Sequence, residues 1–495
     1  MINLDVLMQK RKFVVDLATL LILNLLIKPI WTLIIEPKVQ GQLGNISYGE
    51  YFVVFNFSLM LSILLDMGLS YFNNKNIAQH QHLLSKHLSK MFMLKLSMAV
   101  IYMIFCLVVG YGLLGFNLKL VLILCLNSFF LSLILFLRSN LQALHIFKTD
   151  SYISVLDRIF MLIMLAGMLL GLIPLKITLW SFVWVQTIGY ALTACIAFIV
   201  VWRNTHFFKI QWDLKFNILI IRKSLPYAVL VLLMACYNRL DSIMLERILG
   251  GDYGKQQSGI YAKSFRLLDA ANQIAYLFSV QLLPLFSRMI KMKQSVVKLL
   301  QVSYGLLITP ALIVSISTIF YASYFFDKIY TGDTEGYQVL ALLMSGFTAI
   351  SLTYIFGTLL TAGGHLKLLN RVALTGILIN FGLNFWLIPQ YQVMGTAVSS
   401  IITQFFTGLV QIYLCYKVFE FKINFSIIFS TMVFIFSLCG LAFWSLHWFS
   451  GTNMWMLNFT LLLIGAAMLA FITQMLKFSS LFKLLNKGYD KHAQH

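Results

Sequence analysis

Charged side chains are scarce in this sequence. Only 11% of its 495 residues are Asp, Glu, Lys or Arg, whereas 60% are hydrophobic, and the mean hydropathy is +0.85. Soluble domains carry about 25% charged residues, which keep their surfaces hydrated. The composition therefore excludes a soluble protein and predicts a chain that crosses a membrane many times.

The sequence also lacks polar–apolar alternation and large polar loops. Long apolar runs without alternation exclude a transmembrane β-barrel and leave helices as the spanning elements. The longest outward loop that we expect, residues 36–50, contains no histidine and is too short for a catalytic or nucleic-acid-binding domain. We therefore expect neither enzymatic activity nor a nucleic-acid partner, and we attribute the net charge of +20 to topology and to anionic lipid headgroups.

Paired cysteines and clustered metal ligands are lacking as well. The six cysteines all fall in expected spans and form no Cys-x-x-Cys motif, so we interpret them as buried apolar residues. His80, His82 and His87 could suggest a metal site, but the spacing of two between His80 and His82 puts these two on different faces of a helix, which favours a solvated surface. We expect no metal and no cofactor.

The apolar runs predict an all-α polytopic protein with about fourteen transmembrane helices, because one span needs about 20 apolar residues. The expected spans are residues 13–35, 51–69, 91–114, 120–137, 153–173, 178–201, 224–249, 259–287, 299–326, 337–362, 372–389, 395–416, 425–447 and 455–476.

Lysine and arginine set the expected orientation. With the N-terminus placed in the cytoplasm, 25 of the 37 basic residues lie in cytoplasmic segments, and five lie in outward loops: Lys38, Lys119, Lys176, Lys255 and Lys328. This asymmetry predicts cytoplasmic N- and C-termini. The first apolar run is too long for the core of a signal peptide and should remain as a helix.

Two short matches suggest an internal repeat. Tyr48-Gly49-Glu50-Tyr51 has a counterpart in Ser258-Gly259-Ile260-Tyr261, and the sequence LQALHIFK at 141–148 resembles LTAGGHLK at 360–367. A parallel duplication of six spans places a cavity between two bundles. The domains that we expect are a cytoplasmic N-terminus (1–12), an N-terminal bundle (13–201), a connector (202–223), a C-terminal bundle (224–416), two additional helices (425–476) and a basic tail (477–495).

Most of the charge within the spans lies in a helical hairpin from Cys236 to Arg288. Helical spacing puts Asn238, Arg239, Ser242 and Glu246 on one face of the first helix, and it groups Arg266, Asp269 and Gln273, with Lys263 beside them, on the second. Such stripes either join helices through interhelical pairs or line a polar passage. Cations in a passage suit an anionic headgroup such as pyrophosphate, and carboxylates suit a coupling ion.

The same hairpin carries a family resemblance. The segments DSIMLERILGG, SGIYAKSFRLLDAANQI and LLPLFSR resemble the bacterial lipid-linked oligosaccharide flippases of the polysaccharide biosynthesis family, the O-antigen and capsule exporters. This family belongs to the superfamily of multidrug, oligosaccharidyl-lipid and polysaccharide exporters. The similarity covers about residues 13–416 and includes Tyr48 to Tyr51, Asp66 with Gly68, Leu359 to Lys367, Asn380, Asn384, Leu387 to Pro389, and Gly395 to Ala397.

The resemblance implies two six-helix bundles around a cationic cavity, related by a pseudo-two-fold repeat, and two extra C-terminal helices. It implies a flippase in the bacterial inner membrane that moves an undecaprenyl-pyrophosphate-linked oligosaccharide by alternating access, coupled to protons or sodium. Its partners would be membrane lipids and the polysaccharide polymerase machinery.

We assign site residues as a hypothesis within that resemblance. The candidates for binding pyrophosphate are Arg239, Lys263, Arg266, Lys28 and Arg158, and those for ion coupling or polar cavity contacts are Asp269, Asp16, Glu246, Asn238 and Gln273. The alternatives are a multidrug or cation antiporter of the same superfamily, a lipid II flippase and, more remotely, a membrane polysaccharide polymerase or acyltransferase.

Overall fold

The computed structural model describes residues 19, 22–24, 26–67, 84–144, 146–205, 213–330, 336–421, 424–449 and 454–476. Throughout these ranges the chain is almost entirely helical and contains no strand. The all-α class is therefore confirmed. Asp16, the histidines His80 and His82, and the tail 477–495 lie outside the described residues.

In the described part of the chain, twelve helices are long and apolar enough to cross a membrane. The number fourteen is not confirmed, because two pairs of expected spans each form one element. The element Ile22–Asp66 contains the first pair and bends at Gly44 (φ 72°, ψ 165°). The element Leu366–Phe419 contains the other pair and bends at Gln392 (φ 54°, ψ −129°). Residues 36–50, which we expected as a loop, are thus helical on both sides of a kink.

The chain divides into two compact units, Met1–Ala262 and Lys263–His495. The boundary falls inside one continuous helix. The domain limits expected from the sequence, including the connector 202–223, remain predictions.

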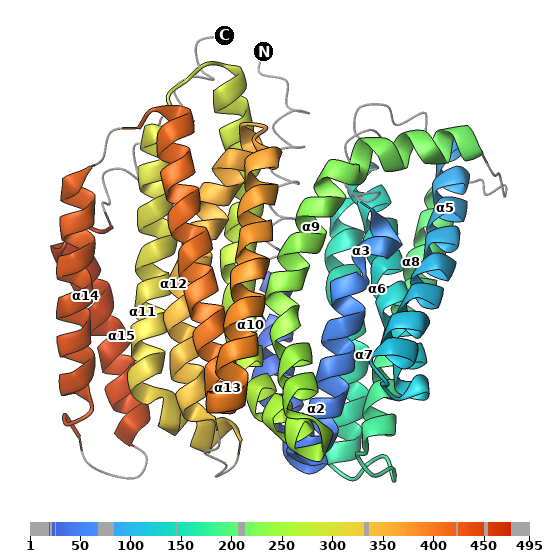
Figure 1. The fold of residues 1–495 in the computed structure, drawn as a ribbon, viewed down its shortest axis with the longest axis horizontal. Helices are drawn as coiled ribbons and strands as arrows, with labels where there is room; N and C mark the ends of the chain where they lie inside the picture. Colours follow the sequence, from blue (N-terminus) through green and yellow to red (C-terminus); the bar gives the residue numbers. More distant parts are fainter. Residues whose placement is uncertain are drawn as a thin grey trace. The chain divides into compact units, whose positions relative to one another are not determined.

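The first unit contains the elements η1 to α9. Their bounds are η1 (Trp31–Ile35), α2 (Glu36–Leu61), α3 (Ile63–Asp66), α5 (Leu84–Cys106), η3 (Leu107–Leu113), α6 (Leu118–Ala143), α7 (Phe147–Leu169), α8 (Leu179–Thr205) and α9 (Leu214–Leu249). Helix α8 packs against α6 and α7, and α2 packs against α9 (Figure 1). The rings of Tyr51 on α2 and Phe182 on α8 make an edge-to-face contact in the core, with their centroids 5.0 Å apart.

The second unit contains most of α10 (Gly251–Lys291) and the elements α11 (Val297–Ile329), α12 (Tyr337–Ala362), α13 (Leu366–Phe419), α14 (Phe425–Ser445) and α15 (Met454–Ile472). Helix α12 packs against both α11 and α13, while α14 and α15 pack together beside α11 (Figure 1). In the most apolar stretch of α11 and of α12, 61% of the residues are buried. The corresponding share is only 17% in α14 and 22% in α15. The last two helices therefore present most of their apolar surface to the surroundings.

The turn of the central hairpin is tighter than expected. Only Gly250, in the left-handed conformation (φ 71°), separates α9 from α10. Residues 255–257, which we expected in the turn, are part of α10. The polar residues of this segment are thus held at helical spacing.

Candidate functional site

The guanidinium of Arg158 on α7 lies over aromatic rings. Its guanidinium carbon is 5.2 Å from the ring centroid of Trp31 and 5.9 Å from that of Tyr190 on α8. Its Nε is 3.5 Å from a carboxylate oxygen of Asp157. Aromatic faces attract a guanidinium and hold its plane, and such contacts are stronger away from water. We call Lys28, Trp31, Asp157, Arg158 and Tyr190 the Arg158 cluster.

Lys28 belongs to the same electrostatic neighbourhood. The charges of Arg158, Asp157 and Arg138 all act on its ammonium group. Lys28 therefore shares its neighbourhood with Arg158, Arg138 and Asp157 within a bundle of apolar helices. The structure brings together two of the residues that we predicted for pyrophosphate, Lys28 and Arg158, and gives their neighbourhood an excess of positive charge.

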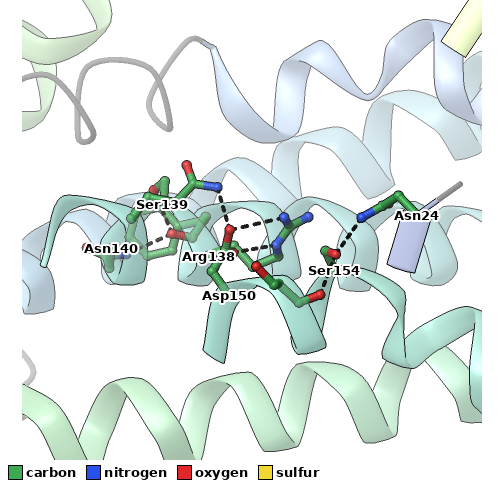
Figure 2. Close-up of polar contacts among 9 residues, drawn as sticks. Asn24, Arg138, Ser139, Asn140, Asp150 and Ser154 are labelled. Atoms are coloured by element: carbon green, nitrogen blue, oxygen red, sulfur yellow. Dashed lines mark hydrogen bonds and ion pairs between the residues drawn. The ribbon is translucent and has the colours of Figure 1, made fainter. Parts of the chain in front are cut away.

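Polar contacts fix the helices next to this cluster (Figure 2). Arg138 at the end of α6 holds Asp150 at the start of α7 through two bonds, Nε to Oδ1 at 2.7 Å and Nη2 to Oδ2 at 3.3 Å. Gln142 donates a further hydrogen bond to Asp150 at 2.9 Å. Asn24 donates a hydrogen bond to the hydroxyl of Ser154 at 2.8 Å, which connects the N-terminal part of the element Ile22–Asp66 to α7.

Arg239 on α9 faces helix α2. Its Nη1 donates to Oδ1 of Asn56 at 3.0 Å, and the amide nitrogen of Asn56 donates to the hydroxyl of Ser242 at 2.9 Å. Asn56 is 1% exposed. The expected common face of Arg239 and Ser242 is therefore observed, and it contacts an asparagine that the sequence did not single out.

The two acids of α9 have different surroundings. Asp241 is buried and accepts a hydrogen bond from the hydroxyl of Tyr261 at 3.1 Å. Glu246 is paired with its neighbour Arg247 at 2.8 Å, and the guanidinium of Arg247 lies 4.3 Å from the ring centroid of Phe116. Asn238 is half-buried on the same helix.

The candidates on α10 from Lys263 onward lie in the second unit. Lys263 is 2% exposed, and its Nζ is 5.6 Å from the ring centroid of Tyr330, whose hydroxyl donates to the Lys263 carbonyl at 2.9 Å. Arg266 and Asp269 are half-buried, and Gln273 is exposed. The roles assigned to these residues remain predictions.

Sequence reasoning missed Trp31, Tyr190, Asn24 and Asn56. A single asparagine inside the apolar run VVFNFSL was a usable signal for Asn56, because a buried amide needs a partner. Nothing in the sequence distinguished Trp31 and Tyr190 from the other aromatic residues. Among the described residues, no group of three or more His, Cys, Asp or Glu side chains could hold a metal ion.

The fold is that of multi-pass transporters. The lipid II flippase MurJ, in an inward closed conformation, aligns with a TM-score of 0.69 and 16% identity over 93% of this chain and 97% of that chain. An inward-facing MATE family multidrug resistance transporter aligns with a TM-score of 0.60 and 12% identity over 79% and 96%. A MATE transporter of Vibrio cholerae aligns with a TM-score of 0.56 and 15% identity over 83% and 96%.

The sequence itself then gives the family. The profile of the family described as "Polysaccharide biosynthesis protein" matches residues 15–290, which is more than half of the chain. The chain therefore belongs to the polysaccharide biosynthesis protein family, as its hairpin motifs indicated. An uncharacterized membrane protein of Methanocaldococcus jannaschii is 25% identical over 205 residues, which are 40% of this chain and 46% of that relative. The chain thus spans about half the length of this curated relative.

Proposed function

We propose that the protein is a flippase that translocates an undecaprenyl-pyrophosphate-linked oligosaccharide across the bacterial cytoplasmic membrane for O-antigen or capsule assembly. The observation that carries this proposal is the Arg158 cluster in a member of the polysaccharide biosynthesis family. Cations within a helix bundle suit a pyrophosphate, and an arginine can bind phosphate oxygens with two parallel hydrogen bonds.

The cluster supplies positive charge and holds one of its cations in place. The ammonium of Lys28 and the guanidinium of Arg158 carry the charge, while the buried rings of Trp31 and Tyr190 lie against the guanidinium. In the second unit, Lys263 and Arg266 supply further positive charge on α10. Both termini lie in the cytoplasm in this proposal, and Asp269 and Asp16 are the candidates for coupling transport to protons or sodium.

The test is a lipid extraction from cells depleted of this protein. We expect undecaprenyl-pyrophosphate oligosaccharide to accumulate on the cytoplasmic face while surface polysaccharide disappears, and we expect the wild-type gene to reverse both changes. Intact polysaccharide together with new sensitivity to cationic compounds would instead identify a drug extruder. Full export by both Lys263→Ala and Arg266→Ala at normal protein levels would contradict the roles assigned to those two residues.

A further inference from the structure

A buried lysine in the first unit occupies a complete oxygen site. Lys95 on α5 is 1% exposed. Its Nζ is 3.0 Å from Oδ1 of Asp66, 2.9 Å from the hydroxyl oxygen of Ser132 on α6, and 3.3 Å from the carbonyl oxygen of Leu65. An ammonium group has three hydrogen-bond donors, so each oxygen accepts one of them.

The oxygens differ in origin but share a preference for cations. Asp66 provides a carboxylate, and Ser132 provides a hydroxyl. Leu65 provides a carbonyl in the last turn of α3, which ends at Asp66 and is followed by Met67 in the left-handed conformation (φ 44°). Carbonyls at a helix C-terminus lack intrahelical partners and carry partial negative charge. Unwound backbone carbonyls and helix C-terminal ends also coordinate sodium in membrane transporters.

The surroundings of these three oxygens favour a positive charge between them. The site lies among α3, α5 and α6, and the ring centroid of Phe136 is 5.4 Å from Nζ. A carboxylate among apolar helices is costly unless a cation neutralises it. One quarter of the Asp66 side chain is exposed, so the carboxylate is only partly buried.

We propose that Asp66, Leu65 and Ser132 form a monovalent-cation site whose resident cation is the ammonium of Lys95. The covalent tether gives the ammonium a high effective concentration, so it excludes sodium and potassium from the native protein. Removal of the ammonium converts the oxygens into a site for an inorganic cation. Under the transport function proposed above, an inorganic coupling ion then binds elsewhere in the chain.

The test compares three purified proteins in sodium, potassium and choline chloride at equal ionic strength. The proteins are wild type, Lys95→Met and Lys95→Met/Asp66→Asn, and the measurement is the melting temperature in detergent. We expect sodium or potassium to raise the melting temperature of Lys95→Met by several degrees over choline. We expect no such rise in the double variant, which lacks the carboxylate, or in wild type, whose site is filled.

Each other result overturns the proposal. Equal melting temperatures of Lys95→Met in all three salts would mean that the oxygens do not bind a free cation. A sodium response of equal size in all three proteins would place the ion at another site. If Lys95→Met gives no folded protein in any of these salts, an inorganic cation cannot replace the ammonium. Because the readout is stability, these outcomes are independent of whether the protein transports a glycan.

Discussion

Gly49 on α2 packs against the backbone of α10, and Gly259 on α10 packs against the backbone of α2. A Cβ atom on Gly49 would clash with the carbonyl oxygen of Lys255, and a Cβ atom on Gly259 would clash with the carbonyl oxygen of Asn45. Gly49 and Gly259 are 210 residues apart, and so are Asn45 and Lys255. The contact is therefore reciprocal, which is what the internal repeat predicts. The whole contact lies within the first unit.

Alanine at either glycine should destabilise the protein. The added methyl group meets backbone atoms, which cannot rotate away as a side chain can, and overpacking of this kind costs about 1–3 kcal/mol or more. We expect Gly49→Ala and Gly259→Ala each to lower the melting temperature in detergent by several degrees. Displacement of α10 should also weaken the hydrogen bond from Gln40 to the Gly259 carbonyl, now 3.0 Å long.

Gly41 on the same helix offers a matched control. A Cβ atom there would meet nothing within 4 Å. Because alanine favours a helix over glycine by up to about 1 kcal/mol, Gly41→Ala should keep or raise the melting temperature. Equal melting temperatures for Gly41→Ala and Gly49→Ala would show that the close contact between α2 and α10 at Gly49 does not contribute to stability.

Composition and span length were sufficient to predict the helical membrane fold, because both reflect the solvent rather than particular contacts. They were insufficient for the helix count. Gly44 and Gln392 bend long helices without a loop, and hydropathy gives a bend and a loop the same polar signal. Gly250 likewise turns the hairpin with one residue, whereas the sequence suggested a turn that includes 255–257.

The candidate site was predictable only in part. Charged residues stand out in an apolar span, so the sequence was sufficient to single out Arg158, Arg239 and Lys28 as candidates. Their partners are neutral residues on other helices, such as Tyr190 and Asn56, and one sequence without distances does not identify them. Helical spacing relates residues on one helix and carries no information about which helix faces which.

The Arg138–Asp150 pair should be the most sensitive ion pair in this part of the structure. Asp150 is 2% exposed and holds three of the hydrogen bonds drawn in Figure 2. Loss of one partner of a buried pair costs about 3–5 kcal/mol because a charge remains without compensation. We expect Arg138→Ala to lower the yield and the melting temperature strongly, and Arg138→Ala/Asp150→Asn to recover a large part of both. Failure of the second substitution to restore stability would exclude the unpaired carboxylate as the cause.

Asn56 should hold α9 against α2. Its side chain bonds both Arg239 and Ser242, and a buried polar group that loses its partner costs about 1–3 kcal/mol. We therefore expect Asn56→Ala to destabilise the protein and to reduce export through displacement of Arg239. Asn204→Ala is the control, because Asn204 is exposed and bonds the backbone of its own helix. Thermal unfolding and surface-glycan staining of both variants at equal protein levels measure the difference.

Arg158 and Arg247 form a natural pair for testing substrate binding. Each follows an acidic residue in the sequence, each contacts that acid, and each lies over an aromatic ring. Only Arg158 lies in the cluster with Lys28. We expect Arg158→Ala to reduce surface-polysaccharide export about tenfold, since loss of one charge-assisted contact of about 1.5 kcal/mol has that effect.

Lysine should restore only part of the loss at position 158, because it keeps the charge but not the planar fork. Arg247→Ala should keep export near the wild-type level at equal protein abundance. The comparison separates binding from stability, since removal of either arginine deletes a similar stacking contact and a similar ion pair. Equal export defects in Arg158→Ala and Arg247→Ala would locate the effect in helix packing and would remove the Arg158 cluster from the substrate path.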